Sequence, residues 1–319
     1  MIKELRGIHH VTAITADPQQ NIDFYLTVLG LRLVKKTVNF DDPGSYHLYY
    51  GDDLGHPGTI MTFFAWAGAF RGRVGTGQLT VTSFFIPQDS VGFWIERLRS
   101  HGVAVERGTR FDEEFLGFSD PDGLQLELVA SPRPDDRSPG DRGPVDPEHA
   151  IRGLHAVTLA VSGPEATAEL LTETMGFHGL EQHGNRFRLE AGPGGPASVV
   201  DLYASPGVPE GIVSAGTVHH VAWRTPDESQ QRAWREAVIA RGLDVTPVLD
   251  RRYFRSIYFR EPGGVLFEIA TDPPGFTLDE SPEQLGTGLR LPPWLETFRP
   301  EVERDLPPIA VPNRAGPAG

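Results

Sequence analysis

Alternating hydrophobic and polar positions mark a structural unit near the N-terminus. The run GIHHVTAITA at 7–16 alternates as a strand does, and strand-like runs return in YHLYYGDD and TIMTFFAW, on either side of a Pro-Gly turn. Between the first run and the others, apolar side chains stand at helical spacing and stop before Gly30: Ile22, Phe24, Tyr25, Val28 and Leu29. The pattern predicts one strand, one helix and about three further strands, or βαβββ.

The same order of elements recurs along the rest of the chain. The run GTVHHVAW at 216–223 opens the last copy, with a helix predicted over 227–241 and then RSIYFRE, a Pro-Gly-Gly turn and VLFEIAT. One intermediate copy runs from GQLTVTSFFIPQDS to GFSDPDGLQLELVA, and another from GLHAVTLAVSGPEA to ASVVDLYA. These four copies predict four tandem βαβββ modules, here called units 1 to 4.

A stretch rich in Pro, Asp and Arg divides the four units into two pairs. SPRPDDRSPGDRGPVDPEH has the composition of a linker, which we place at 131–150. We therefore predict one pair of modules at 1–130 and a second pair at 151–272. The Pro-rich tail at 273–319 is expected to pack on the body of the protein instead of forming a domain.

Charge and cysteine content narrow the chemistry. The formal charge of −14 comes without a basic stripe, so we expect no nucleic-acid partner. No apolar run approaches the roughly 18 residues of a membrane span, and the N-terminus lacks the apolar stretch of a secretory signal, so we expect a cytoplasmic protein without a membrane partner. Because the chain has no cysteine, a metal ion would be held by His and carboxylates.

Alignment of the four units with one another isolates one set of metal-ligating residues. The equivalent position in the four first strands is filled by His10, Val81, Ala156 and His220, in that order. The equivalent position in the four last strands is filled by Thr62, Glu127, Asp201 and Glu268. A site that pairs unit 1 with unit 4 would contain His10, His220 and Glu268, a two-His-one-carboxylate set that leaves coordination positions open. A site from units 2 and 3 would lack imidazole, so we expect one metal only.

Strand alternation favours the second His of each doublet as the ligand. Successive side chains of a strand point to opposite faces. His9 shares a face with Val11 and Ala13, which is the apolar face expected to pack on helices, whereas His10 shares the polar face with Thr12. The same alternation favours His220 over His219 in unit 4, and it turns Glu268 inward.

Four tandem βαβββ units over residues 5–272 resemble the vicinal-oxygen-chelate superfamily, which includes glyoxalase I, bleomycin-resistance proteins and extradiol dioxygenases. The resemblance implies an α+β fold in which the modules form two cupped, partly open mixed-sheet barrels. HHVT, VKKTVNFDDPGSYHLYYGD, RRYFRSIYFREPGGVLFE and the tail segments PPGFTLDE and LGTGLRLPPW resemble one branch more specifically. That branch is the hydroquinone-type ring-cleaving dioxygenases.

This resemblance implies a non-haem Fe(II) enzyme, with Mn(II) in some members, that inserts O2 into a hydroquinone or catechol-like aromatic. The residues that support the metal ligands in that branch map onto His9, Thr12, His219, Arg251 and Tyr258. The map conflicts with strand alternation at His9 and His219, and a bulge would reconcile the two. Tyr49 matches Tyr258 in unit 1 and is a candidate wall of the substrate pocket, with core packing as the alternative.

Two other functions of the same superfamily remain open at this point. A metal-dependent glyoxalase-type isomerase or lyase usually has four protein ligands, but the fourth position here is Thr62, which is a poor ligand. A non-enzymatic small-molecule-binding protein of the resistance type needs no metal triad. The sequence also leaves open whether the chain forms a homo-oligomer.

Overall fold

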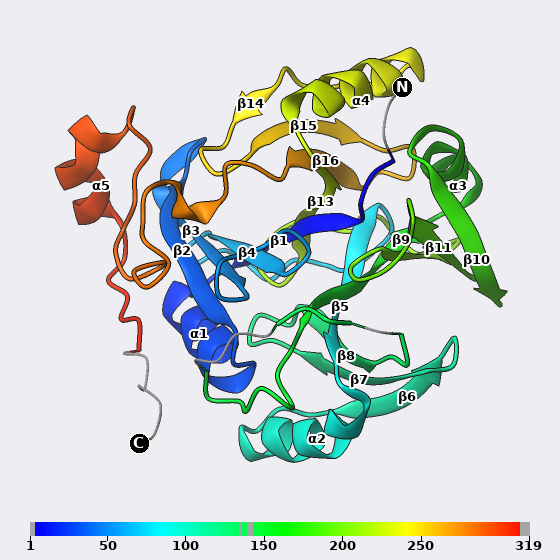
Figure 1. Cartoon of the computed structure of the whole chain (residues 1–319), viewed down its shortest axis with the longest axis horizontal. Helices are drawn as coiled ribbons and strands as arrows, with labels where there is room; N and C mark the ends of the chain where they lie inside the picture. Colours follow the sequence, from blue (N-terminus) through cyan, green and yellow to red (C-terminus); the bar gives the residue numbers. More distant parts are fainter. Residues whose placement is uncertain (1–3, 134, 139–142, 313–319) are drawn as a thin grey trace.

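The computed structural model describes residues 4–133, 135–138 and 143–312, and each of the four repeats folds as a βαβββ unit (Figure 1). Unit 1 contains β1 (Ile8–Thr15), α1 (Pro18–Asp23), a π-helical turn (Phe24–Val28), β2 (Arg32–Asn39), β3 (Asp42–Gly51) and β4 (Ile60–Ala65). Unit 2 contains β5 (Gln78–Ile86), a 3-10 turn (Gln88–Ser90), α2 (Val91–Ser100), β6 (Glu106–Arg110), β7 (Glu113–Ser119) and β8 (Gln125–Ala130).

Units 3 and 4 repeat this order after the linker. Unit 3 contains β9 (Gly153–Val161), α3 (Glu165–Glu169), a π-helical turn (Leu170–Thr174), β10 (Phe177–His183), β11 (Arg186–Ala191) and β12 (Val199–Ala204). Unit 4 contains β13 (Val218–Thr225), α4 (Glu228–Ala240), β14 (Leu249–Asp250), β15 (Arg255–Arg260) and β16 (Leu266–Thr271). The α+β class and the four modules predicted from the repeats are confirmed.

The strands form two curled, eight-stranded mixed sheets. Each sheet combines one unit from the N-terminal pair with one unit from the C-terminal pair. The first sheet has the order β14-β15-β16-β13-β1-β4-β3-β2, and therefore combines units 1 and 4. The second has the order β10-β11-β12-β9-β5-β8-β7-β6, and combines units 2 and 3. In each sheet the first strands of the two units pair antiparallel at the centre, β1 with β13 and β5 with β9. The helices lie on the outer side of the sheets (Figure 1).

Local sequence signals explain where the helices begin. Asp17 accepts hydrogen bonds from the backbone N–H groups of Gln19 and Gln20, and Pro18 occupies the first turn of α1. Asp227 caps α4 in the same way, through the N–H of Gln230. The predicted helix at 227–241 is observed as Glu228–Ala240. Capping satisfies backbone donors that a helix N-terminus leaves unpaired.

Apolar packing between the helices and the outer faces of the sheets forms the main core. Val11, Val221 and Phe267 are fully buried on the central strands of the first sheet. Trp94 of α2 and Trp223 of β13 are the largest fully buried side chains. Because this face of each sheet is sealed by helices, the opposite, concave face remains for polar residues and a cavity.

The C-terminal tail lies against the first sheet. It contains 3-10 turns at Phe276–Leu278 and Glu296–Phe298 and the short helix α5 (Arg299–Asp305). The fully buried Lys35 of β2 forms ion pairs with Glu280 and with Asp279, the latter at 2.6 Å. In the described part of the chain, no helix is long and apolar enough to cross a membrane.

Candidate metal centre

Two β-bulges at the centre of the first sheet coincide with the two His-His pairs, His9-His10 and His219-His220. Ile8 lies opposite Trp223 and His10 lies opposite Ala222, so His9 is an extra residue on β1. Thr12 lies opposite His220 and Ala13 opposite Val218, so an extra residue on β13 falls at His219.

These bulges correct the expectation from strict alternation, which placed His9 and His219 on the helix side of the sheet. A bulge locally interrupts the ladder and redirects the side chain of the extra residue. The His9 ring instead lies 5.1 Å from the His10 ring, measured between centroids, and the His219 ring lies at the same distance from that of His220. His219 lines the cavity that contains the ligand set, and His9 is buried beside it.

The three residues singled out by the repeat alignment lie together on the concave face. His10 of β1, His220 of β13 and Glu268 of β16 place one potential ligand atom each within 4.8 Å of one another. Glu268 Oε2 lies 2.9 Å from Nε2 of His220 and 3.4 Å from Nε2 of His10. All three side chains are buried. Burial of a carboxylate is costly unless it is paired or coordinates a metal.

The two oxygens of Glu268 have different environments. Oε1 accepts a hydrogen bond from the hydroxyl of Ser256, whereas Oε2 has no hydrogen bond of acceptable geometry from the described residues. Although burial alone would raise the pKa of Glu268, the neighbouring His10 and His220 hold that pKa well below its usual range. Burial lowers the pKa of His220. An ionised carboxylate and neutral imidazoles are the protonation states in which these groups bind metals.

Each of the two clustered histidines, His10 and His220, is paired through its other ring nitrogen. Nδ1 of His10 lies 2.9 Å from Nδ1 of His9, and Nδ1 of His220 lies 2.8 Å from Nδ1 of His219. The Nε2 atoms of His10 and His220 are thereby left facing Glu268. Histidines that bind metals generally donate the second ring N–H to a neighbouring group, which fixes the tautomer and the orientation of the ring. The residues present therefore fit a divalent metal ion.

A cavity of about 320 Å³ opens directly over this cluster. The sequence-predicted residues His10, His219, His220, Arg251, Tyr258, Glu268 and Tyr49 line it. Two predicted residues, His9 and Thr12, are buried and do not line the cavity. Arg251 Nε donates a hydrogen bond to the Tyr258 hydroxyl oxygen over 3.2 Å, and Arg251 also pairs with Asp41 at 2.9 Å. Burial raises the pKa of Tyr258, so this hydroxyl stays protonated.

Several cavity residues were not singled out as site residues from the sequence. The aromatic walls are formed in part by Phe64, Trp66 and Phe254, and His47 of β3 lies beside Tyr49. His47 and Tyr49 are two residues apart on one strand and therefore share its concave face. That spacing is a sequence signal for His47. Phe254 precedes β15 in a loop, where alternation carries no information.

In the second sheet, arginine side chains pair with the carboxylates that correspond to Glu268. Arg110 pairs with Glu127, and Arg188 forms a two-point interaction with Asp201 at 2.8 and 3.0 Å. Glu127 and Asp201 stand at the position that Glu268 holds in unit 4. Guanidinium groups thus neutralise the carboxylates that face this second cup.

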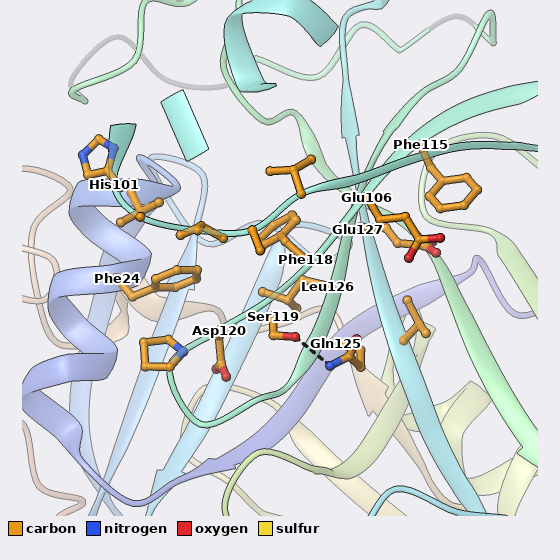
Figure 2. A pocket seen from close by; sticks show the side chains of 18 residues that line it. Phe24, His101, Glu106, Phe115, Phe118, Ser119, Asp120, Gln125, Leu126 and Glu127 are labelled. Carbon is orange, nitrogen blue, oxygen red and sulfur yellow. Dashed lines mark hydrogen bonds between the residues drawn. The ribbon is translucent and has the colours of Figure 1, made fainter. Parts of the chain in front are cut away.

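A larger cavity of about 680 Å³ lies elsewhere, between the first helical segment and unit 2 (Figure 2). Phe24, Phe118 and Leu126 contribute apolar walls, and Asp120 lies at one side. Burial raises the pKa of Asp120 to about 7. Asp120 accepts a hydrogen bond from the Leu124 backbone and one from Tyr25, so it serves the turn after β7. None of the three clustered ligand residues lines this cavity.

Comparisons with known proteins agree with this fold. The sequence model of the Glyoxalase/Bleomycin resistance protein/Dioxygenase superfamily matches residues 7–128 and 153–269. The chain is 47% identical over 316 residues to the Bacillus subtilis protein named "Putative ring-cleaving dioxygenase MhqO", covering 98% of this chain and 99% of that one. It is 36% identical over 313 residues to a chlorohydroquinone/hydroquinone 1,2-dioxygenase of Sphingobium indicum, covering 95% and 97% of the two chains.

Solved structures show the same relationship. A crystal structure from Bacillus subtilis superposes with a TM-score of 0.91 at 46% identity, covering 97% of this chain and 99% of that one. Glyoxalase I from Zea mays superposes with a TM-score of 0.62 at 18% identity, covering 83% and 92% of the chains, which is a likeness of fold. The superfamily model thus matches residues in all four units of the chain. This chain belongs to the glyoxalase, bleomycin-resistance protein and dioxygenase superfamily.

Proposed function

We propose that the protein is a non-haem ring-cleaving dioxygenase that binds Fe(II), with Mn(II) as the alternative metal, through His10, His220 and Glu268. The observation that carries the proposal is the convergence of two imidazole Nε2 atoms on Oε2 of Glu268 inside a buried cavity. Two His and one carboxylate occupy one face of an ion and leave the other positions to non-protein ligands.

The proposed substrates are O2 and a hydroquinone or catechol-like aromatic. The cavity walls favour a flat aromatic ring, because Phe64, Trp66 and Phe254 lie around the ligand set. The Phe254 ring centroid lies 5.0 Å from that of His10. The name of the Sphingobium relative supports a phenolic substrate of this kind. The bond broken would lie next to a hydroxylated ring carbon.

Fe(II) in this site would supply the one-electron chemistry through which O2 reacts with an aromatic ring. Around it, the protein residues bind the substrate and manage protons. Tyr258, whose oxygen already accepts a hydrogen bond from Arg251, has its hydroxyl proton available for an ionised substrate oxygen. His219 is held neutral, because burial and His220 lower its pKa to about 3. Because its Nδ1 accepts the Nδ1–H of His220, a neutral His219 carries its proton on Nε2, where it can donate a hydrogen bond to a ligand oxygen.

The position of Thr62 argues against an isomerase of the glyoxalase type. Thr62 stands in unit 1 where Glu268 stands in unit 4, and its hydroxyl hydrogen bonds to His47 at 2.5 Å. A hydroxyl group is a poor base at neutral pH, whereas a carboxylate in that position would serve as one.

The proposal is tested with protein purified without oxygen, loaded with Fe(II) and supplied separately with hydroquinone, catechol and the hemithioacetal of methylglyoxal and glutathione. We expect oxygen uptake and a visible-absorbing, ring-opened product with one of the two diols. Isomerisation of the hemithioacetal without oxygen uptake would contradict the proposal. His220→Ala should lose both iron and activity, and the exposed His101→Ala is the matched control.

A further inference from the structure

Two tyrosines related by the internal repeat face the same cavity from different units. Tyr49 of β3 lies opposite Thr62 of β4, and Tyr258 of β15 lies opposite Glu268 of β16. β3 and β15 are each second from an edge of the sheet, with four strands between them. Both tyrosines line the cavity, so the curled sheet brings strands from its two sides to one space.

The hydroxyl groups of Tyr258 and Tyr49 have different hydrogen-bond partners. The partner of Tyr258 can only donate, whereas the partner of Tyr49 can donate or accept. Tyr258 accepts from Arg251, and a guanidinium group has only donors. The proton of Tyr258 is therefore not used by Arg251 and remains for another acceptor. Tyr49 has no arginine partner in the described structure and instead lies 2.8 Å from Nδ1 of His47. His47 thus determines whether Tyr49 donates or accepts.

A chain of hydroxyl groups fixes the tautomer of His47. Thr62 Oγ1 donates to Thr12 Oγ1 over 3.3 Å, which uses its only proton. Thr62 must then accept at its second contact, where Nε2 of His47 lies 2.5 Å away. A neutral imidazole that carries its proton on Nε2 has a lone pair on Nδ1. Nδ1 of His47 therefore accepts the proton of the Tyr49 hydroxyl.

Burial supports the neutral forms that this chain requires. Burial, together with the nearby His10, lowers the pKa of His47 well below its usual range. Burial also raises the pKa of Tyr49 well above its usual range. With its proton donated to His47, the Tyr49 oxygen has lone pairs left for a ligand hydroxyl.

We infer that His47 is a positioning residue that makes Tyr49 a hydrogen-bond acceptor, so that the cavity selects an aromatic diol with one ionised and one protonated oxygen. This inference rests on the proposed function for the chemical class of the ligand. Tyr258 supplies a donor for the ionised oxygen, and Tyr49 supplies an acceptor for the hydroxyl that keeps its proton. A phenol without a second O–H offers no donor to the lone pairs of the Tyr49 oxygen, which keeps only its hydrogen bond to His47.

The test compares two probes, hydroquinone and 4-methoxyphenol, which differ in the second O–H. Their affinities for Fe(II)-loaded protein are measured by calorimetry without oxygen, so that no turnover occurs. We expect wild type to prefer hydroquinone by roughly tenfold, the value of about one well-placed hydrogen bond in a buried site. Tyr49→Phe and His47→Leu should both reduce this preference to about one.

Matched variants separate positioning from general damage. In His47→Asn, the side-chain oxygen replaces Nδ1 as an acceptor, and the preference for hydroquinone should be largely restored. Tyr46→Phe changes a tyrosine of the same strand whose hydroxyl donates to the Pro307 carbonyl, and it should keep the preference. Melting temperatures of all variants show whether each one folds.

The outcomes distinguish this inference from the proposed function. A preference that survives in Tyr49→Phe and His47→Leu overturns the inference, as does equal binding of both probes by wild type. A His47-dependent preference without oxygen uptake upholds the inference and counts against the dioxygenase. Oxygen uptake with hydroquinone, together with a preference that does not depend on His47, supports the dioxygenase and overturns the inference.

Discussion

Nδ1 of His219 lies 2.8 Å from Nδ1 of His220, and the bulge on β13 brings these rings together, because regular alternation would turn them to opposite faces of the sheet. His9 and His10 form the same arrangement at 2.9 Å. Each doublet therefore works as one unit: the second histidine presents Nε2 to the ligand cluster, and the first holds the orientation of its ring.

Removal of the supporting histidines should weaken metal binding. We expect His9→Ala and His219→Ala each to lower metal affinity by roughly 10- to 100-fold, because the ligand ring loses its hydrogen-bond partner and its fixed tautomer. Competition with a chelator of known affinity measures the effect. The exposed His101→Ala serves as control. Unchanged affinity in both variants would show that the Nδ1 contacts are packing contacts only.

One metal ion should bind per chain and should stabilise the fold through Glu268. At a free metal concentration about 100 times the dissociation constant, binding adds about 2.7 kcal/mol to the free energy of unfolding. Thermal unfolding with and without Fe(II) should show this shift in wild type. Glu268→Gln removes the anionic ligand and should abolish it. A second equivalent of tightly bound metal, retained in Glu268→Gln, would place a site elsewhere.

Asp120 should make the protein less stable as the pH rises. Burial raises its pKa in the folded state to about 7, above the ordinary value of 3.8, so the folded state retains a proton that the unfolded state releases. The free energy of unfolding therefore falls between about pH 4 and pH 7, by on the order of 4 kcal/mol in total. Asp120→Asn removes this titration.

Urea unfolding of wild type and Asp120→Asn at pH 5 and pH 8 measures the effect. The stability of the variant relative to wild type should increase by roughly 2–3 kcal/mol from pH 5 to pH 8. The exposed Asp89→Asn should leave the difference between the two pH values unchanged. A relative stability of Asp120→Asn that does not depend on pH would mean that Asp120 is ionised in the folded state throughout.

Lys35 should hold the C-terminal tail on the first sheet. Its ammonium group is fully buried and pairs with Asp279 and Glu280. Lys35→Met leaves these carboxylates without that cation, and we expect a loss of roughly 3–5 kcal/mol in the free energy of unfolding. Limited proteolysis should detect earlier cleavage in the tail. Lys36→Met, at the next and partly exposed position of β2, should cost much less.

The repeated pattern predicts most of the fold because each unit encodes its own elements. Apolar alternation, helical spacing and a glycine after the helix recur in each module, and these are local signals. The distribution of histidine also predicts that units 1 and 4 supply one site, because His10 and His220 occupy equivalent positions while Val81 and Ala156 fill the others. Sheet order bears this pairing out, since β1 and β13 lie side by side.

Other features of the site depend on contacts between segments that are distant in the sequence. A bulge is an extra residue on one strand relative to its partner strand. The HHV sequence of one strand alone therefore does not show that its first histidine falls outside the regular pairing. The polarity of Tyr49 depends on His47, Thr62 and Thr12, which β3, β4 and β1 bring together only in the folded sheet. Residue types and their periodicity thus specify the modules and the candidate ligand set. Register, burial and hydrogen-bond direction depend on which strands meet, and tertiary packing alone sets them.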